Sequence, residues 1–316
     1  MTPTLVIPEW PAWLHARRYR AEIEDARVAV SDRRTATAKN FDAVWFPWNG
    51  MSWTTDAPAI ATLHDASLYA LPAADADVAA RERKPFEAAA AGARRILTDS
   101  AFSKSELEKH LRIAPERIAV VPLGVSTPSP RSTAPARFEG LTRYLLFVGE
   151  PENRKGLDTF ADAVALLAPS LREGLGIVLA GKGTEAQSTA EFDVPLRRLG
   201  HVDDRRLAGL YAGATAFVYP SRYEGFGLPV LEAMSHGTPV IASDFPAIAE
   251  AGGDAALYFP VGDAARLAAL IGSVLGDASV GVLLKGRSLL RASAMTWDKT
   301  AALTLSEIVS AIAQNT

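Results

Sequence analysis

The sequence predicts an α/β protein built from two parallel-sheet units that follow one another along the chain. Short apolar runs alternate with amphipathic segments through most of the 316 residues, which is the pattern of strands alternating with helices. The segment "STPSPRSTAPARFEG" (126–140) interrupts the alternation, and the pattern then starts again. A chain of this length is long for one domain and sufficient for two. Both sheets are therefore expected to be parallel and covered by helices on both faces.

The first unit is expected over residues 1–125. Ser103 and Glu106 have the spacing of a capping box, which predicts a helix through Leu111. The segment 126–140 is rich in proline, serine and threonine and is interpreted as a linker. The candidate strands of this unit are 28–31, 43–48, 58–64, 95–100 and 117–124.

The second unit is expected over residues 141–296, followed by a terminal helix within 297–316. Helices are predicted at 156–168, 263–277 and 297–313, because apolar residues recur on one face of each. On the last helix that face contains Ala301, Leu305, Ile308 and Ile312. The candidate strands are 143–149, 176–181, 196–202, 215–221, 238–243 and 255–259.

Composition excludes several classes of function. The net charge of −3 gives no basic excess for nucleic acid, and no polybasic run indicates an anionic membrane. The chain has no cysteine, so it has no disulfides and no thiolate zinc site. No signal peptide and no apolar run of membrane-spanning length is present, so a cytoplasmic protein is expected. Peripheral membrane attachment through a surface helix and homo-oligomer formation stay open.

Glycine is distributed unevenly along the chain. Residues 1–123 contain only Gly50 and Gly92, and the remaining twenty-one of the 23 glycines follow them. Open α/β sheets bind ligands at the carboxyl ends of their strands, where glycine lets the backbone approach a phosphate. The second unit is therefore the better candidate for binding a phosphorylated ligand.

Residues 221–244, "SRYEGFGLPVLEAMSHGTPVIASD", form the first candidate site. Pro229 suits the first turn of a helix and Gly237 its end, so "RYEGFGL" is interpreted as a strand-to-helix loop whose amides bind an anion. Glu224 begins this loop, and Glu232 lies in the first turns of the helix. Acids on both sides of an anion-binding turn suit a nucleotide sugar, with Glu232 holding the ribose. The alternative is an ordinary loop with two solvated glutamates.

Two further segments are candidates for the same site. Arg154 and Lys155 in "GEPENRKGL" (149–157) precede a helix, where cations are unfavourable unless they bind an anion; a solvated basic pair is the alternative. His64 in "TLHDASL" (62–68) ends an apolar strand and could meet a ligand across a cleft. A hydrogen-bonded structural histidine is the alternative there, and Asp65 is interpreted as a helix cap.

Other motifs are weak or missing. The "DAD" at 75–77 matches a metal-binding pattern, but it lies in an alanine-rich stretch rather than at a strand end. The sequence has no dinucleotide fingerprint, no P-loop, no nucleophile elbow and no H-E-x-x-H. No metal site and no bound cofactor is expected.

Several segments, in order, resemble one family. "PSRYEGFGLPVLEAMSHGTPVIAS" closely resembles the E-x7-E signature of family 4 glycosyltransferases, which are retaining enzymes of the GT-B fold. "FVGEPENRKGL", "TLHDASL" and "ILTDSAFSKSELEKHLRIAPERIAVVPLGV" also look like segments of that family, as do "LGHVDDRRLAGLYAGATAFVYPS" and "TWDKTAALTL". The resemblance implies two Rossmann-like domains facing a cleft, with the C-terminal helix returning towards the N-terminal domain.

The resemblance also implies roles for individual residues. Glu224 would contact hydroxyls of the donor sugar, and Glu232 would bind the ribose. Arg154 and Lys155 would neutralise the leaving diphosphate in place of a metal ion. His64 would lie near the reacting centre, which makes Glu224, His64 and Lys155 the catalytic candidates.

A second set of residues would act through the backbone. Gly225, Phe226, Gly227 and Leu228 would contact the sugar and phosphate, and Val202 would contact the base. In the family's favoured mechanism the departing phosphate helps to deprotonate the acceptor, so the protein contributes positioning and electrostatics. The expected reaction is hexose transfer from a UDP- or GDP-linked sugar to a carbohydrate or lipid-linked acceptor, as in polysaccharide biosynthesis.

The first forty residues depart from the family pattern. They contain no glycine, and His64 comes early in the chain, so the N-terminal sheet is expected to lack one or two strand–helix units. Glu150 also places a negative charge near the expected phosphate site. A nucleotide-sugar-binding partner or scaffold without activity therefore remains an alternative, as does a phosphorylase or an epimerase on the same fold.

Overall fold

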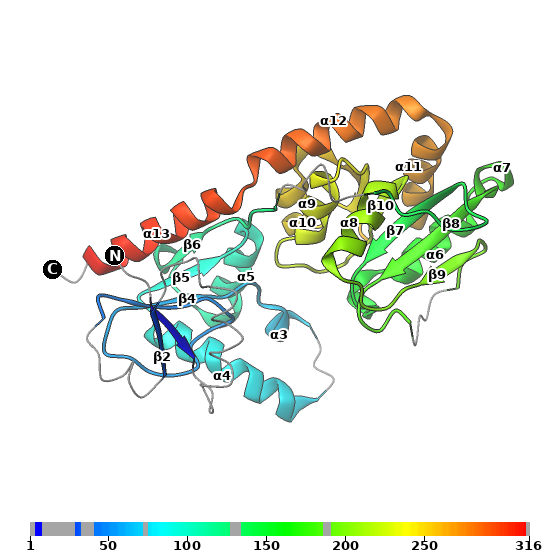
Figure 1. The fold of residues 1–316 in the computed structure, drawn as a ribbon. Coiled ribbons are helices and arrows are strands. Elements are labelled where there is room, and N and C mark those ends of the chain that lie inside the picture. The colour runs from blue at the N-terminus through cyan, green and yellow to red at the C-terminus, as the bar shows by residue number, and fades with distance from the viewer. Residues whose placement is uncertain are drawn as a thin grey trace.

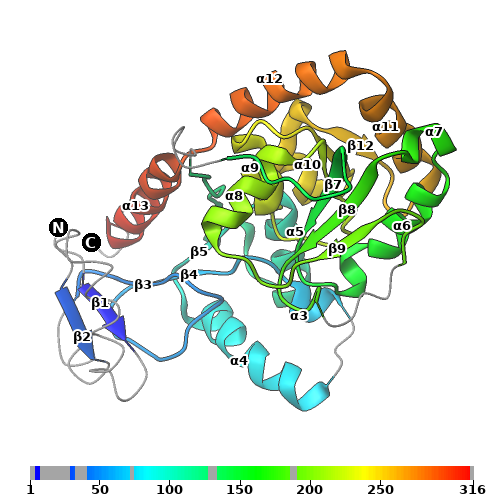
Figure 2. The same ribbon diagram turned by 45° about the vertical axis from the view of Figure 1, so that its right-hand side comes forward.

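The computed structural model describes residues 4–7, 29–32, 41–71, 75–126, 134–185 and 191–313. Within them the chain forms two larger parallel sheets and one small one, as the sequence predicts for an α/β protein. Figure 1 shows the two larger sheets, each with its own helices, as two bodies side by side, and Figure 2 shows them from a second direction. The body with the four-stranded sheet is called the N-terminal lobe, and the body with the six-stranded sheet the C-terminal lobe.

The N-terminal lobe has the strand order β3-β4-β5-β6, with every pair parallel. Its core contains apolar side chains from the sheet and from α4 and α5, among them Ala61, Phe86, Ile96 and Leu107. The elements are β3 (Val44–Phe46), β4 (Ala59–Thr62), α3 (Ser67–Ala70), α4 (Ala76–Gly92), β5 (Arg95–Thr98), α5 (Ala101–Leu111), the 3-10 turn η1 (Pro115–Arg117) and β6 (Ile118–Val120).

A separate two-stranded sheet lies at the start of the chain. β1 (Thr4–Ile7), which the sequence analysis did not anticipate, pairs in parallel with β2 (Ala29–Asp32). Most of the first forty residues, on which the expected shortening of the N-terminal sheet rests, lie outside the described residues. The shortening therefore stays a prediction.

The C-terminal lobe has the strand order β12-β11-β10-β7-β8-β9, again with every pair parallel. Its strands are β7 (Arg143–Val148), β8 (Leu175–Ala180), β9 (Leu196–Arg198), β10 (Ala216–Tyr219), β11 (Val240–Ser243) and β12 (Leu257–Phe259). Its helices are α6 (Leu157–Ala165), α7 (Pro169–Arg172), α8 (Asp204–Gly213), α9 (Leu228–Ser235), α10 (Pro246–Gly252), α11 (Ala264–Gly276) and α12 (Ala278–Ala294).

Helices cover both faces of the six-stranded sheet. On one face α6 and α11 bury Phe160 and Ile271 against the strands. On the other face α8, α9 and α10 bury Tyr211, Met234 and Ile248. This doubly wound arrangement brings the carboxyl ends of the strands to one edge, which is where such sheets bind ligands.

The chain crosses between the lobes at two adjacent points. Val125 donates its backbone N–H to the carbonyl of Met295 at 3.0 Å, and a Cβ on Gly124 would lie 2.2 Å from the backbone nitrogen of Trp297. The outgoing and returning segments therefore touch backbone to backbone, which only glycine permits at position 124. The expected linker begins here; residues 127–133 of it lie outside the described residues.

The returning segment is α13 (Trp297–Ala313), which has the bounds the sequence predicts. It lies along the N-terminal sheet (Figure 1), where Ala311 is buried among Ile60, Leu97 and Val121. Arg94 donates to the carbonyl of Ala311 at 2.8 Å. The C-terminal helix thus packs on the N-terminal lobe, as expected.

Two sequence-based details are wrong. The N-cap of α5 is Ser100, whose hydroxyl oxygen accepts from the backbone N–H of Ser103, so Ser103 lies inside the helix and is not its cap. On α13, Ala301 and Leu305 are exposed, because the helix is rotated so that Thr304 and Ala311 are buried; of the predicted face, Ile308 does pack on the N-terminal core. Packing against the N-terminal sheet, which hydrophobic periodicity alone does not encode, sets this rotation.

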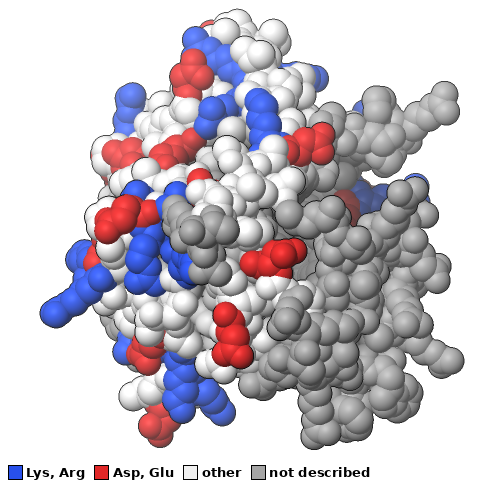
Figure 3. Space-filling model, turned by 90° about the vertical axis from the view of Figure 1, so that its left-hand side faces the viewer, with Lys and Arg blue, Asp and Glu red and all other residues white. Residues whose placement is uncertain are grey.

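Two surface properties bear on binding partners. The face seen in Figure 3 carries acidic and basic side chains interspersed, without a field of one sign. Among the described segments, no single helix is long and apolar enough to cross a membrane. The segments Ala264–Gly276 and Ala278–Ala313 have the length and composition only when taken together, and they are bent by 101° relative to each other.

Candidate functional site

The loop between β10 and α9 has the shape that the sequence predicts. β10 ends at Tyr219 and α9 begins at Leu228. Gly227 has φ 105° and starts the helix from a left-handed conformation, which residues with a side chain rarely adopt. Pro229 lies in the first turn of α9, and Gly237, at φ 70°, follows its end. The predicted strand, loop and helix over 215–237 are confirmed.

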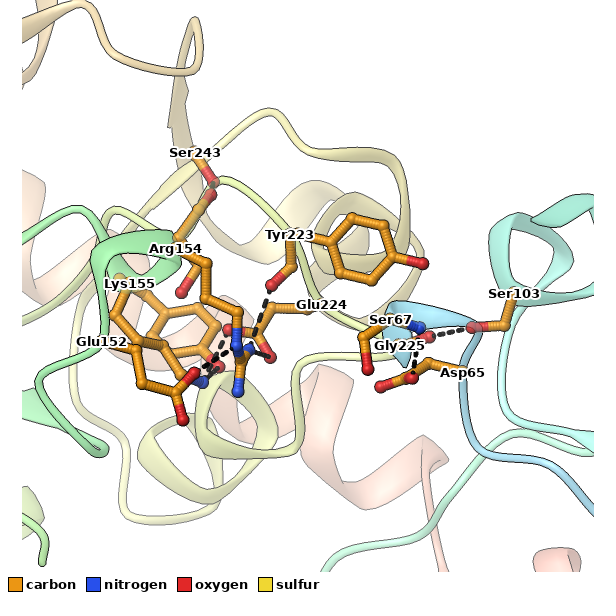
Figure 4. A network of polar contacts seen from close by, with 12 residues as sticks. Asp65, Ser67, Ser103, Glu152, Arg154, Lys155, Tyr223, Glu224, Gly225 and Ser243 are labelled. Carbon is orange, nitrogen blue, oxygen red and sulfur yellow. Dashed lines mark hydrogen bonds and ion pairs between the residues drawn. The ribbon is translucent and has the colours of Figure 1, made fainter. Parts of the chain in front are cut away.

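Within this loop the carboxylate of Glu224 is paired with a cation from another loop. Its Oε1 lies 2.7 Å from Nζ of Lys155, and both side chains are buried. Nζ of Lys155 also donates to the hydroxyl of Tyr219 at 3.3 Å. Burial and the nearby charge of Glu224 raise the pKa of Tyr219 well above its ordinary value, so this phenol is neutral. Figure 4 shows the side chains of Lys155 and Glu224 pointing toward one another.

Close backbone packing holds the two loops together. Arg154 and Lys155 form the 3-10 turn η2 (Asn153–Lys155), directly before α6. Gly156 follows at φ 68°, and a Cβ there would lie 2.2 Å from the carbonyl oxygen of Pro220. Arg222 donates its N–H to the carbonyl of Arg154 at 2.7 Å. The turn with the two cations is thereby fixed against the loop with Glu224.

Arg154 is the second cation of this group. Its guanidinium donates to Glu152 at 2.5 Å and to Glu224 at 3.3 Å. Burial acts to lower the pKa of Arg154, but the charges of Glu224 and Glu152 outweigh it and the pKa is raised. Glu150 is exposed and lies outside this group. Two cations thus face two carboxylates, and an incoming phosphate can replace the carboxylates as their partner.

Glu232 belongs to a separate hydrogen-bonded group on α9. Its Oε2 accepts from the hydroxyl of Tyr211 at 3.0 Å, and the Tyr211 ring stacks on His236 at 5.4 Å. Burial raises the pKa of Glu232, while the hydrogen bond from Tyr211 opposes that shift. The structure therefore brings Glu224, Arg154 and Lys155 together and gives Glu232 a partner of its own, Tyr211.

The residues expected to act through the backbone lie around the same loop. Phe226 is buried in the core of the C-terminal lobe, so its side chain is structural and only its backbone can face a ligand. Leu228 is the first residue of α9. Val202 is half-buried and packs on the same core, just before Asp203 caps α8.

His64 lies at the end of β4 in the N-terminal lobe. Its Nδ1 is 2.9 Å from Oδ2 of Asp99, and its backbone N–H donates to Asn49 at 3.1 Å. Asp65 accepts from the N–H of Ser67 at 2.8 Å, but the N-cap of α3 is Ala66 and no side chain caps this helix, so the expected capping role of Asp65 is wrong. A Cβ on Gly225 would come within 2.8 Å of both the His64 carbonyl oxygen and the Asp65 Cβ. The strand end with His64 thus touches the loop with Glu224.

Further contacts between the lobes were missed by the sequence analysis. Phe102 of α5 lies edge-on to Phe245 at 4.7 Å and to Tyr223 at 5.6 Å. The carboxylate of Glu250 on α10 accepts from the first two amides of α5, those of Ala101 at 2.7 Å and Phe102 at 2.9 Å. The fragment "TDSAF" (98–102) spans the end of the strand predicted at 95–100, and that position was the available signal.

The "DAD" segment has a structural role. Asp75 is the N-cap of α4 and accepts from the amides of Asp77 and Val78. In the part of the chain that the structure describes, no cluster of three or more histidine, aspartate or glutamate side chains has the arrangement of a metal site.

Comparison with protein families gives two matches. The model of Glycosyltransferase Family 4 matches residues 5–128, and that of Glycosyl transferases group 1 matches residues 142–277. The O-antigen chain mannosyltransferase B of Escherichia coli is 33% identical over 265 residues, which are 78% of this chain and 69% of the relative. The MMP alpha-(1->4)-mannosyltransferase of Mycolicibacterium hassiacum is 30% identical over 227 residues, 69% of this chain and 54% of that protein.

Solved structures of distant sequence share the fold. A sucrose-phosphate synthase from Thermosynechococcus elongatus superimposes with a TM-score of 0.70 at 20% identity, covering 98% of this chain and 81% of its own. The crystal structure of Anabaena HepE in complex with UDP and glucose superimposes with a TM-score of 0.69 at 15% identity. The match covers 98% of this chain and 100% of the HepE chain. At such identities the likeness shows the fold alone.

Proposed function

The chain belongs to the family 4 glycosyltransferases and has the GT-B fold, and on that premise we propose that it transfers a hexose from a UDP- or GDP-linked sugar with retention of configuration. The acceptor in this proposal is a carbohydrate or a lipid-linked glycan. The mannosyltransferase names of two relatives support a mannosyl donor, and the O-antigen relative supports a role in polysaccharide biosynthesis.

One observation carries the proposal. Lys155 and Arg154 meet Glu224 at the carboxyl ends of the C-terminal strands, beside a glycine-containing loop. A buried ammonium and a half-buried guanidinium at such a position are suited to a diphosphate, because hydrogen bonds between charged groups are strong where water is excluded. The released Glu224 then accepts hydrogen bonds from hydroxyls of the sugar.

The chemistry needs no protein nucleophile in this proposal. As the bond between the anomeric carbon and the phosphate oxygen breaks, negative charge grows on the diphosphate, and Lys155 and Arg154 stabilise it in place of a metal ion. The oxygen of the acceptor hydroxyl forms the new bond to the anomeric carbon on the same face of the sugar, and its proton passes to the departing phosphate oxygen. Gly225, Gly227 and Leu228 contribute backbone contacts to the donor, and Glu232 and Val202 hold the ribose and base.

The test is binding followed by turnover. The purified chain is screened against UDP-, GDP- and dTDP-sugars by melting shift, and nucleotide release is then measured with glycan acceptors, with and without a chelator. We expect one donor to stabilise the protein, nucleotide release to need that donor, and chelation to have no effect. Glu224→Gln should abolish release, whereas the exposed Glu139→Gln should not.

Different outcomes separate the alternatives. Stabilisation by a donor without turnover on any acceptor would indicate a binding protein rather than an enzyme. Dependence on inorganic phosphate would indicate a phosphorylase, and conversion of the nucleotide sugar alone an epimerase. Strict dependence on magnesium would contradict the proposed role of Lys155 and Arg154.

A further inference from the structure

Asp99 is a buried carboxylate with an unusual partner. It follows β5 directly and is 5% exposed. Its Oδ2 accepts from Nδ1 of His64 at 2.9 Å, and His64 occupies the corresponding position after the neighbouring strand β4. The pair therefore joins the carboxyl ends of two adjacent strands of the N-terminal lobe.

The other ring nitrogen of His64 has no matching partner. Nε2 is buried and has no partner of good hydrogen-bond geometry among the described residues, although the carbonyl of Pro47 lies close to the ring. The exposed ring of Trp48 lies edge-on to the imidazole, with the two ring centroids 5.2 Å apart. Buried polar atoms in native proteins are nearly always hydrogen-bonded, so an unpaired nitrogen at a strand end indicates a site completed by a ligand.

The pair is adjacent to the donor loop of the other lobe. The His64 carbonyl and Asp65 pack against Gly225, and Ser100, the residue after Asp99, donates its hydroxyl to the Gly225 carbonyl at 2.6 Å. Any displacement of the β5 end would move both the partner of His64 and the support of the loop. Asp99 and Ser100 therefore affect the proposed reaction centre in two ways, one through His64 and the other through the loop that contains Glu224.

We propose that Asp99 is a positioning residue for sugar transfer: by accepting the Nδ1 proton it fixes the ring plane of His64 and stabilises the imidazolium, so that the Nε2 proton is donated to an oxygen of the donor. This inference rests on the proposed function for the identity of that donor. Neither the sequence motifs nor the comparisons assign a role to Asp99. A carboxylate behind a functional histidine is a recurring way to orient the ring and to make it more basic.

The electrostatics agree with this geometry. Burial of the ring acts to lower the pKa of His64, but the hydrogen bond and charge of Asp99 outweigh it, and the pKa is raised. Asp65 and the carbonyl of Pro47 act in the same direction. Burial raises the pKa of Asp99 as well. These groups and the neutral Trp48 lie near the ring, and they favour a protonated imidazole that donates from Nε2.

The experiment uses Asp99→Asn in the full chain. The asparagine keeps the shape and one acceptor oxygen but removes the charge. We expect kcat to fall about 10- to 100-fold with little change in donor KM. Because the pKa of His64 falls in the variant, the alkaline limb of the pH profile should move to lower pH. Histidine NMR of the free protein should show the same drop in the His64 pKa.

A double-mutant cycle and a matched carboxylate separate positioning from structure. In a His64→Ala background Asp99→Asn should cost no further activity, whereas a merely structural Asp99 would cost the same in both backgrounds. Asp42→Asn changes an exposed aspartate of the same lobe and should leave kcat near that of the wild type. An active wild type whose kcat, pH profile and His64 pKa do not respond to Asp99→Asn overturns the inference. An inactive wild type counts against the proposed function, and the NMR titration then decides about Asp99 alone.

Discussion

The carbonyl oxygen of Gly225 accepts a 2.6 Å hydrogen bond from the hydroxyl of Ser100, a residue of the opposite lobe. Ser103 donates to the same oxygen at 2.8 Å. The loop with Glu224 is therefore held from both sides, by η2 within its own lobe and by the start of α5 in the other. Its geometry depends on the two lobes staying together.

Gly225→Ala tests that dependence. The added Cβ would lie 2.8 Å from the His64 carbonyl oxygen, and Gly225 has no positive φ to complicate the result. The lobes must separate slightly, so we expect transfer activity to fall about tenfold or more, because reacting groups tolerate little misplacement. The measurement is kcat/KM together with the melting temperature.

The matched control is Gly286→Ala. Gly286 lies inside α12, and a Cβ there meets nothing within 4 Å. Alanine is the better helix former by about 1 kcal/mol, so this variant should be more stable and fully active. Wild-type activity in Gly225→Ala would show that the contact between the lobes does not matter for transfer.

Glu250→Gln tests the second tie between the lobes. The Glu250 carboxylate satisfies two amides at the N-terminus of α5, where a negative charge also interacts favourably with the helix dipole. We expect a loss of about 1–2 kcal/mol in the free energy of unfolding and a larger radius of gyration by small-angle scattering. Equal scattering from variant and wild type would mean that the aromatic contacts of Phe102 are sufficient to hold the two lobes together.

Lys155→Met removes the buried cation and keeps most of its volume. We expect transfer to fall about 100-fold, because charge on the leaving diphosphate loses its nearest partner. Glu224 keeps only Arg154, so the free energy of unfolding should fall by about 3 kcal/mol. The double variant Lys155→Met/Glu224→Gln should recover part of that stability and none of the activity. Normal turnover in the single variant would refute the phosphate assignment.

Tyr211→Phe tests the proposed ribose site through pH. A carboxylate binds ribose hydroxyls only when ionised, and burial raises the pKa of Glu232, so donor affinity should decline as pH falls through that raised value. Tyr211 opposes the shift, so its removal should raise the pKa further and move the decline to higher pH. At neutral pH the donor KM should rise about tenfold, with kcat at saturating donor nearly unchanged. A KM profile identical to that of the wild type would leave Glu232 without the proposed role.

The sequence predicted what depends on local pattern. The terminal helix has the expected bounds, and the loops with Glu224 and Lys155 meet because both follow parallel strands, whose carboxyl ends share an edge. The sequence analysis missed Asp99 and Glu250, because their partners lie 35 and about 150 residues away along the chain and no local pattern distinguishes these two residues. It placed the cap of α5 at Ser103 rather than Ser100 because both serines fit a cap and only the backbone conformation decides.

The position of α13 has a consequence for how the molecule is made. Arg94 finds its partner at Ala311, 217 residues further along. During translation the N-terminal sheet is synthesised long before this helix leaves the ribosome, and the apolar patch of Ile60, Leu97 and Val121 remains uncovered until then. A nascent chain stalled before α13 should therefore expose this apolar surface, to which chaperones would bind.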